Sequence, residues 1–589
     1  MPLPASGWVM VLGLAIAVGL GLTLRALMKR RQGRPRAFGQ PVERDRDVGR
    51  TDLLRHARAG LEPQAYHDEQ VWRDLDLTLV LGVLDRTHSW IGLQCLRERL
   101  SRRDASAADL RALDTEVSFM VDAATRRAWY ADRLDPLGEW SAGALAGLFW
   151  GALPPTPWFR PWLLMLSWAM VAALVATVLK PAWFVLIIAV ASVNLAVKSV
   201  LKQRIEPWLP AMRSLPDFLR VTTTFARADD TALAGPLDEL RAASPTIRSL
   251  RGAVRWARLD AGGESAIAGT AAEFSQVMHE FLNLAFLLDV NGFYSVARRL
   301  DRDREMIRRA FLALGRIDMA ISLASVRVST TWTRPAPAPP RTLRIEGLVH
   351  PLVASPVGAD AVIADRSWLV TGSNMSGKST FLRALGVGAV MAQSLGMVFA
   401  RRWEGPSVRV LTSIGRSDAV AEGTSYYLAE VERIKVLLDA AAAADPCLFL
   451  LDELYRGTNT PERVAAALAV LEHLDHAPHV VVVATHDLEL LHWLAGRYES
   501  WHFREEVTSG GLTFDYRLRP GGSSTRNALA LLEVMGYPAP LVARSREVVG
   551  QPPPQVVSGR SVTAAADGAG SGGQSPPPAS RASNSSTVA

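Results

Sequence analysis

The sequence predicts a multidomain chain in which transmembrane helices and an all-α core come first and an α/β domain follows. Three observations predict this. Some uncharged apolar runs are long enough to cross a bilayer, apolar residues elsewhere in the first half recur three and four positions apart, and the second half alternates short apolar strands with helices. The length of 589 residues supports at least two folded units.

Composition and charge narrow the class of protein. Apolar residues make up 49% and charged residues 21%, which is too hydrophobic for a disordered chain and too charged for a transporter embedded mostly in the bilayer. The net charge of +7 does not indicate a broad DNA-binding face, because a cluster of cations from Arg25 to Arg36 meets no acid before Glu43. Cys95 and Cys447 lie far apart in apolar stretches, which excludes a disulfide framework and favours a reducing, cytoplasmic location for most of the chain.

The segment 1–24 carries no charged side chain and predicts a transmembrane anchor. Trp8 to Leu24 is nearly all apolar and about long enough to cross a hydrocarbon core. A cleaved signal peptide or a buried helix is the alternative, but a signal peptide carries its cations before the apolar run, and here they follow it. The positive-inside rule then places the amino terminus outside and a basic linker, 25–70, in the cytoplasm.

Two further uncharged runs predict a transmembrane hairpin over 161–197 that turns at Lys180 and Pro181. Arg160 precedes the hairpin and Lys198 follows it, so both of its ends are expected inside. The apolar stretch 141–159 is broken by prolines, and we expect an interfacial or core segment there, with a fourth span as the alternative. These segments predict a multi-pass protein of the cytoplasmic (inner) membrane.

The rest of the chain divides into three parts. From 71 to 340 we expect a helical core, interrupted by the hairpin, because apolar residues such as Leu77, Val80, Leu81 and Leu84 have helical spacing. The proline-rich run RPAPAPPR then marks a boundary, and 341–549 has the strand and helix alternation of an α/β domain. The tail 550–589 is rich in Pro, Gly, Ser and Ala and is expected to be disordered.

A glycine-rich loop, TGSNMSGKST from Thr371, lies between a predicted strand and a predicted helix over 381–393. In that context it matches the phosphate-binding loop GxxxxGK[ST]. Lys378 would reach the β- and γ-phosphates of ATP, and the hydroxyl of Ser379 would ligate Mg²⁺. The alternative is a Gly/Ser turn that only caps a helix. The predicted nucleotide-binding residues are Gly372, Ser373, Asn374, Met375, Ser376, Gly377, Lys378, Ser379 and Thr380.

Two acids, Asp452 and Glu453, end the apolar run CLFLLDE, which we expect to be a buried strand. Asp452 would hold Mg²⁺ through water and Glu453 would polarise the attacking water. His486 follows another apolar strand, 480–484, at the same edge of a parallel sheet, which predicts a γ-phosphate sensor or water-positioning role. The alternatives are a solvated acidic surface and a structural histidine.

Together these residues resemble the ATPase domain of the MutS family. The resembling runs are Asn374-Met375, SIGRSDAVAEGTSYYLAEV from Ser413, DELYRGTNT from Asp452, ATHD from Ala484 and GGSSTRNALALLEVMGYP from Gly521. VLDRTHSWIGLQCLRERL from Val83 and LGRIDMAISLA from Leu314 are similar to the start and the return of the family's helical core. The resemblance therefore covers about 71–549 and implies an all-α, lever-like core before an α/β P-loop ATPase domain of the ABC type.

The resemblance also implies a homodimer with composite ATPase sites. Gly423, Thr424 and Ser425 match the family's form of the ABC signature, whose serine reaches the γ-phosphate bound by the other subunit, and the following helix carries Glu430. A cross-subunit loop of the family is similar to the run Gly457, Thr458 and Asn459. The segment from Gly521 is similar to a segment of the family that supports dimerisation.

Some positions depart from the family's pattern. Ser373 and Ser376 replace the Pro and Gly that are usual in the loop, and Tyr455 stands where Gly is common. The serines are small and should not abolish nucleotide binding. Mismatch recognition in the family uses a Phe-x-Glu wedge, but here Phe503-Arg504-Glu505 lies beyond the ATPase strands and predicts an ordinary strand, and only the linker separates the predicted anchor from the core.

These features predict a membrane-anchored MutS-like ATPase that lacks the mismatch-recognition domain, with double-stranded DNA, mismatched or not, as a candidate partner. An ABC-type transporter is one alternative, but SGGQ at 571–574 lies in the tail rather than between the nucleotide motifs, and three helices are few for a translocation path. A membrane tether whose ATPase regulates assembly with a protein partner is the other alternative.

Overall fold

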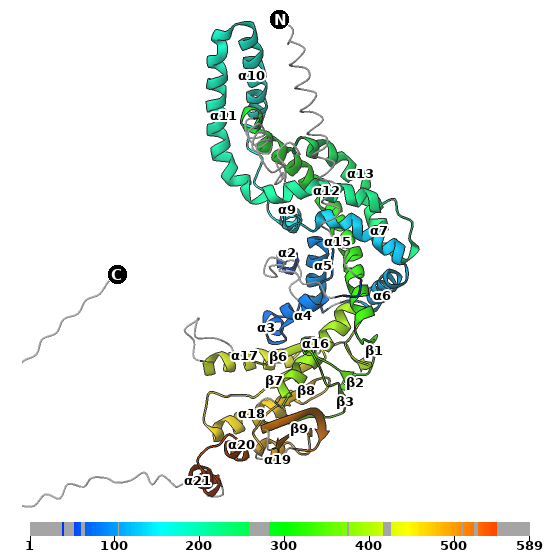
Figure 1. Ribbon diagram of the computed structural model, residues 1–589, viewed down its shortest axis with the longest axis vertical. Coiled ribbons are helices and arrows are strands. Elements are labelled where there is room, and N and C mark those ends of the chain that lie inside the picture. Colours follow the sequence, from blue (N-terminus) through cyan, green and yellow to red (C-terminus); the bar gives the residue numbers. More distant parts are fainter. Residues whose placement is uncertain are drawn as a thin grey trace, which may run out of the picture. The chain divides into compact units, whose positions relative to one another are not determined.

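The computed structural model describes residues 38–40, 52–60, 65–103, 105–257, 282–373, 376–415, 426–443, 445–508, 511–522 and 528–549. The predicted anchor 1–24 and tail 550–589 lie outside these residues. The chain divides into two compact units, of which the second comprises Val507–Gly511 and the chain from Arg526, with helices α20 (Ala528–Val534) and α21 (Ala539–Val549). The first unit holds all that is described below except the ends of two strands at Val507–Gly511, and it confirms the predicted combination of a helical domain with an α/β domain (Figure 1).

The helical domain begins before the predicted hairpin and resumes after it. Its helices are α2 (Leu53–Ala59), α3 (Glu69–Asp74), α4 (Leu77–Leu84), α5 (Trp90–Ser101), α6 (Ala107–Asp122), α7 (Ala124–Leu134), α8 (Trp140–Gly143), α9 (Leu145–Trp150), α12 (Leu209–Phe225), α13 (Ala234–Ala257) and α15 (Leu288–Ser329). The apolar positions predicted on α4 are all buried.

The two core motifs of the sequence meet where α5 crosses α15. Asp318, fully buried on α15, accepts hydrogen bonds from the amides of His88 (2.8 Å) and Ser89 (2.7 Å), which precede α5. The crossing is close, because a Cβ placed on Gly92 would lie 2.2 Å from the Asp318 carboxylate and one on Gly315 would lie 2.2 Å from the sulfur of Cys95. Small residues at both positions therefore set the distance between the helices.

The predicted boundary between linker and core, at residue 71, is too late. Helix α2 lies within the expected linker, Leu54 is fully buried against the core, and Arg55 pairs with Glu69 at 2.8 Å. A helix of seven residues among charged neighbours carries too short an apolar pattern to be detected by its period.

The apolar stretch 141–159 packs into the helical core through α8 and α9. Phe149 is buried, and its ring centroid lies 5.3 Å from that of Phe218 and 5.8 Å from that of Phe311. Helix α9 ends at Trp150 because Gly151 and the following prolines leave helical geometry. This is the core segment that we expected there, in place of a fourth span.

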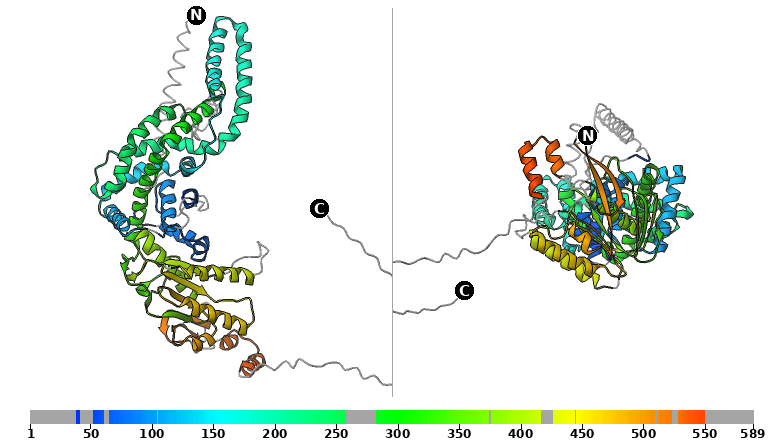
Figure 2. Two further views of the ribbon diagram at one scale, coloured as in Figure 1. Left: turned by 180° about the vertical axis from the view of Figure 1, so that it is seen from behind. Right: turned by 90° about the horizontal axis from the view of Figure 1, so that it is seen from below.

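The predicted hairpin forms helices α10 (Arg160–Leu179) and α11 (Phe184–Ile205), which run side by side (Figures 1 and 2). In the described part of the chain, two helices are long and apolar enough to cross a membrane: α10, and the helical stretch that contains α11. Their apolar side chains are largely exposed, with Trp168 at 73% and Val178 at 86%. The core helix of a soluble protein would bury these side chains.

Two sheets build the α/β domain, whose strands and helices alternate along the chain. The strands are β1 (Ala336–Pro337), β2 (Thr342–Leu348), β3 (Ala359–Ala364), β4 (Ser367–Thr371), β5 (Arg402–Gly405), β6 (Arg409–Ser413), β7 (Cys447–Asp452), β8 (Val480–Ala484), β9 (Tyr498–Thr508) and β10 (Gly511–Pro520), and the helices are α16 (Lys378–Leu395), α17 (Tyr426–Ala441), α18 (Thr460–Leu474) and α19 (Glu489–Trp493). The small sheet has the order β1-β5-β2-β3 and the large sheet β10-β9-β4-β8-β7-β6.

The large sheet is buried on both faces, which explains why its central strands are apolar throughout. Alternate residues such as Val370 and Leu450 belong to the core beneath α16, whereas Leu369 and Phe449 belong to a second core beneath α17 and α18. The strands from β9 to β6 pair in parallel, so their carboxyl ends share one edge.

Candidate nucleotide-binding site

Three strand ends bring the predicted site residues to one edge of the large sheet. Val370 on β4 pairs with Ala484 on β8, and Ala484 in turn pairs with Asp452 on β7. The phosphate loop, the acidic pair and His486 follow these three strands, and they therefore emerge next to one another. The structure thus brings together site residues that lie more than a hundred positions apart along the chain.

The phosphate loop turns sharply at two glycines. Gly372 has φ +141° and Gly377 has φ +110°, which are conformations that side-chain-bearing residues rarely adopt. A Cβ on Gly372 would also lie 2.8 Å from the Ser376 hydroxyl and 3.0 Å from the carbonyl oxygen of Phe503. The hydroxyls of Ser373 and Ser376 are buried without a hydrogen-bond partner in the described structure, so polar groups face the loop interior. Asn374 and Met375 lie outside the described residues.

The first turn of α16 supplies the cation and hydroxyl predicted for the site. The ammonium group of Lys378 donates to the carbonyl oxygens of Gly372 (2.7 Å) and Ser373 (2.8 Å), so it lies over the loop. The hydroxyl of Ser379 donates to Oδ2 of Asp452 at 2.6 Å, and Thr380 is exposed. The amino end of α16 adds the positive end of a helix dipole beside these groups.

The two oxygens of the Asp452 carboxylate differ in their contacts. Its Oδ1 is buried and has no hydrogen-bond partner among the described residues, although the side chain is only 5% exposed. An unsatisfied buried carboxylate oxygen is costly unless an ion or water completes it. Mg²⁺ in nucleotide sites is bound by one or two protein oxygens together with phosphate and water, which suits the Ser379 and Asp452 pair.

Glu453 has contacts on both carboxylate oxygens. Its Oε1 lies 3.2 Å from Nδ1 of His486, and its Oε2 lies 2.7 Å from Nε of Arg456. Arg456 also lies 3.8 Å from Asp452, so one guanidinium group lies close to both acids. Arg456 is not among the residues predicted from the sequence, where the available signal is a cation three residues after Glu453 in the turn that leaves β7.

The loop after β7 adopts left-handed backbone geometry at two residues. Glu453 has φ +54° and Tyr455 has φ +59°, so the glycine that is common in the family at position 455 would avoid a steric cost. The amide of Tyr455 donates to the carboxylate of Glu430 on α17. Burial raises the pKa of Glu430, while this hydrogen bond and the charge of Arg456 oppose the rise. The loop is thus tied to the helix that follows the predicted signature.

The residues predicted to act across a dimer are only partly described. Gly423, Thr424 and Ser425 lie outside the described residues. Of the predicted cross-subunit loop, Asn459 caps α18 by accepting a hydrogen bond from the amide of Glu462 at 3.1 Å. A Cβ on Gly457 would lie 3.0 Å from Cβ of Tyr427, which keeps this loop close to α17.

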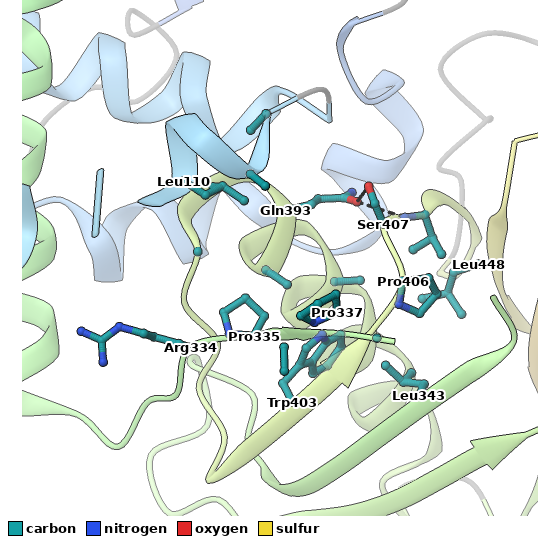
Figure 3. A pocket seen from close by; sticks show the side chains of 18 of the residues that line it. Leu110, Arg334, Pro335, Pro337, Leu343, Gln393, Trp403, Pro406, Ser407 and Leu448 are labelled. Carbon is teal, nitrogen blue, oxygen red and sulfur yellow. Dashed lines mark hydrogen bonds between the residues drawn. The ribbon is translucent and has the colours of Figure 1, made fainter. Parts of the chain in front are cut away.

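A separate cavity of about 470 Å³ lies where the helical domain meets the α/β domain, away from the phosphate loop (Figure 3). Leu110 on α6 faces Pro337, Leu343 and Trp403 across it, and the amide of Gln393 meets the hydroxyl of Ser407 at its edge. The lining is mostly apolar and contains none of the predicted nucleotide-binding residues.

Comparisons with known proteins agree with this geometry. Residues 368–551 match the family described as MutS domain V. The DNA mismatch repair protein MutS of Natronomonas pharaonis is 33% identical over 273 residues, which cover 45% of this chain and 32% of that protein. The protein of the same name from Thermus thermophilus is 34% identical over 261 residues, covering 44% of this chain and 32% of the relative.

A third relative, DNA mismatch repair protein MutS 2 of Halobacterium salinarum, is 32% identical over 296 residues, covering 49% of this chain and 34% of the relative. The chain thus spans about a third of the length of the curated relatives that it matches. Part of this chain, including the matched domain at residues 368–551, is thus similar to MutS proteins.

Proposed function

We propose that this protein is a membrane-anchored MutS-like ATPase that binds and hydrolyses ATP with Mg²⁺ at composite sites in a homodimer. The observation that carries the proposal is the junction of three strand ends, where Ser379 contacts Asp452 and Glu453 faces His486. The similarity to MutS domain V and to MutS proteins supports ATP hydrolysis as the activity.

The site residues divide the work of hydrolysis. Lys378 and the loop amides would hold the phosphates, and Ser379 with Asp452 would hold the ion, which neutralises developing charge on the phosphates when bound. Glu453 would accept a proton from the attacking water, with His486 orienting it. In the described arrangement Oε2 of Glu453 also lies 2.7 Å from Nε of Arg456, and the carboxylate keeps further lone pairs that can accept the proton.

Replacement of Lys378 tests the site directly. The full chain, purified in detergent, should hydrolyse ATP only with Mg²⁺, and Lys378→Ala should lose about a hundredfold or more of this activity because its cationic contact to the phosphates is removed. Lys435→Ala is the matched control, since Lys435 is exposed on α17 and pairs only with Asp439 at 3.1 Å. Hydrolysis by Lys378→Ala at the unmutated rate would contradict the proposal.

Double-stranded DNA is the proposed partner of the helical domain. The support is the similarity to proteins described as DNA mismatch repair proteins over the shared third of their length. Contacts to DNA phosphates give a steep loss of affinity with salt. Binding of a mismatched and a matched duplex by the detergent-purified protein at several salt concentrations tests this, and binding that salt leaves unchanged would argue against DNA as the partner.

The proposed location is the cytoplasmic membrane, with the ATPase domain inside. The exposed apolar surfaces of α10 and α11 support insertion of the hairpin into the bilayer. The cations at the two ends of the hairpin, Arg160 and Lys198, support an orientation with both ends in the cytoplasm. A cysteine introduced at Lys180, in the turn, should react with an impermeant maleimide added to intact cells, whereas one at Ser561 should not. Reaction at Ser561, or protection at Lys180, would overturn this topology.

A further inference from the structure

The hairpin helices each direct one polar side chain at the same short backbone segment. Asn194 on α11 is fully buried, and its side-chain amide donates to the carbonyl oxygens of Leu284 (3.1 Å) and Ala285 (2.9 Å). Ser167 on α10 donates to the carbonyl oxygen of Phe286 at 2.8 Å. Both side chains lie within predominantly apolar stretches of these helices, where a polar group is costly unless it has a partner.

These hydrogen bonds give partners to carbonyl oxygens at a break between two helical segments. Residues 282–286 are helical, Leu287 has the left-handed φ of +49°, and α15 starts at the next residue. The last carbonyl oxygens of a helix have no partner within it and need side chains or water. Asn291 adds a third side chain, which donates to the carbonyl oxygen of Phe286 at 3.2 Å. The break is therefore supported from both hairpin helices and from α15.

The positions of Ser167 and Asn194 along the hairpin indicate how deep residues 284–286 would lie in a bilayer. Ser167 follows Arg160 by seven residues, which is about 10 Å of helix, and Asn194 precedes Lys198 by four, which is about 6 Å. Half of a hydrocarbon core is about 15 Å thick. If Arg160 and Lys198 mark the cytoplasmic surface, residues 284–286 lie below it, inside the cytoplasmic half of the bilayer.

The side chains of the segment suit that depth. Leu282, Leu284, Phe286 and Leu288 are all half-exposed, while Asn283, Ala285 and Leu287 between them are buried. In water these half-exposed apolar side chains would lie beside an already exposed apolar hairpin. In a bilayer the same side chains contact acyl chains, and the irregular backbone is covered by protein, as the hydrocarbon region requires.

We propose that residues 282–288 form a re-entrant membrane element that contacts lipid acyl chains beside the hairpin. This inference rests on the proposed membrane anchorage and adds a third membrane contact, in a part of the chain that the charge pattern places wholly in the cytoplasm. In this proposal Asn194 and Ser167 hold the backbone of residues 284–286 within the cytoplasmic half of the bilayer. The helix α15, which returns to the ATPase domain, would then start in the membrane.

Single cysteines in the full chain test the element. The native Cys95 and Cys447 are buried and give little background. The reporters are Phe286→Cys, Trp168→Cys on the exposed face of α10, and Arg302→Cys on the exposed surface of α15. Inside-out membrane vesicles are treated with an impermeant maleimide, and the initial rates are normalised to labelling in sodium dodecyl sulfate.

We expect the thiols at 286 and 168 to react at least about tenfold more slowly than the thiol at 302, because the charged, impermeant reagent is excluded from the hydrocarbon core. A lipid-soluble maleimide should label positions 286 and 168 but not Val290→Cys, whose position is 1% exposed. Fast aqueous labelling at 168 would overturn the membrane anchorage itself. Two outcomes would overturn the re-entrant element alone. In one, the thiol at 168 is protected while the thiol at 286 reacts quickly with the aqueous reagent. In the other, the thiol at 286 reacts with neither reagent.

The role of Asn194 is tested in the same assay. Asn194→Leu should raise the aqueous labelling rate of Phe286→Cys severalfold and leave Trp168→Cys protected, because only the broken segment loses its support. Ser192→Ala is the matched control on α11, since the Ser192 hydroxyl is exposed and bonds only to the carbonyl oxygen of Ile188 in its own helix. Equal labelling of Phe286→Cys with and without Asn194→Leu would contradict the assigned role.

Discussion

The carboxylate of Asp74, in the helical domain, accepts a hydrogen bond from the backbone amide of Ile414 at 2.9 Å. Ile414 follows β6 and leads into the segment that carries the predicted signature. The carbonyl oxygen of Asp74 accepts from Arg383 on α16, the helix that begins in the phosphate loop. From α17, Arg433 pairs with Asp68, the cap of the same helix α3, at 2.9 Å. One short helix, α3, thus contacts the helix that begins in the phosphate loop, the residue that follows β6, and α17.

Asp74→Asn should lower ATP hydrolysis while ATP still binds at Lys378. The side chain is only 5% exposed, and an amide nitrogen turned toward the Ile414 amide would leave a buried donor unpaired, at a cost of about 1–3 kcal/mol. Asp76→Asn is the control, because Asp76 is more exposed and only pairs with Arg383 at 3.4 Å. Equal turnover by both variants, measured beside nucleotide binding, would argue against a role for Asp74 in positioning the signature segment.

Glu453→Gln should bind ATP and hydrolyse it at least about a hundredfold more slowly, since the acceptor for the proton of water is lost. Ser379 and Asp452 remain in contact, so the variant should accumulate as an ATP-bound dimer, which light scattering detects. Mixing it with a Ser425→Arg chain tests composite sites, because each defect then reports on the partner subunit. Normal hydrolysis by Glu453→Gln would show that another group activates water.

Arg456→Gln should lower the Mg²⁺ concentration needed for ATP binding. The guanidinium of Arg456 contacts Glu453 and lies near Asp452, where it competes electrostatically with the ion. Its side chain is 30% exposed, so we expect a roughly two- to fivefold change, as for a partly screened pair. Arg456→Lys keeps the charge and should resemble the unmutated chain in a Mg²⁺ titration with a fluorescent ATP analogue. A weaker Mg²⁺ requirement in both variants would contradict competition by charge.

His67 should make folding sensitive to mild acid. Burial, with the nearby charge of Arg103, lowers the pKa of His67 from 6.5 to about 4. Between these values the unfolded chain binds a proton that the folded chain does not, so stability is lost as the pH falls from about 6.5 to about 4. At pH 5 the loss should be about 2 kcal/mol, seen as a lower urea midpoint than at pH 7.5. His67→Gln should remove this difference, and His56→Gln, at an exposed site, should keep it.

Local pattern predicted that most of the candidate site residues would lie at one edge of the sheet. Lys378, Asp452 and His486 each follow an apolar strand that is buried on both faces, and parallel strands bring their carboxyl ends to one edge. No comparable pattern identifies Arg456 as the partner of Glu453, because an arginine in a turn is usually a solvated side chain. The contact arises from the left-handed backbone at residues 453 and 455, which depends on Glu430 from another helix.

The contacts between the domains could not be predicted from the sequence either. Asp74 and Ile414 are separated by 340 positions, and nothing in either neighbourhood indicates the other. Helix α2 falls within the predicted linker because its seven residues are too few to show a helical period in the sequence. In the hairpin, apolar length predicted the two helices, but the partners of Asn194 lie ninety residues away, past a segment outside the described residues.

The apolar pocket between α6 and α16 weakens the packing between the two domains at that place. It holds about 470 Å³ and is open to solvent, so the side chains that line it have no protein atoms on one side. Such side chains lose the dispersion attraction that a close-packed seam would give them. A larger apolar side chain at Ala389 or Ala392, which both line the pocket, should therefore strengthen the contact between the domains.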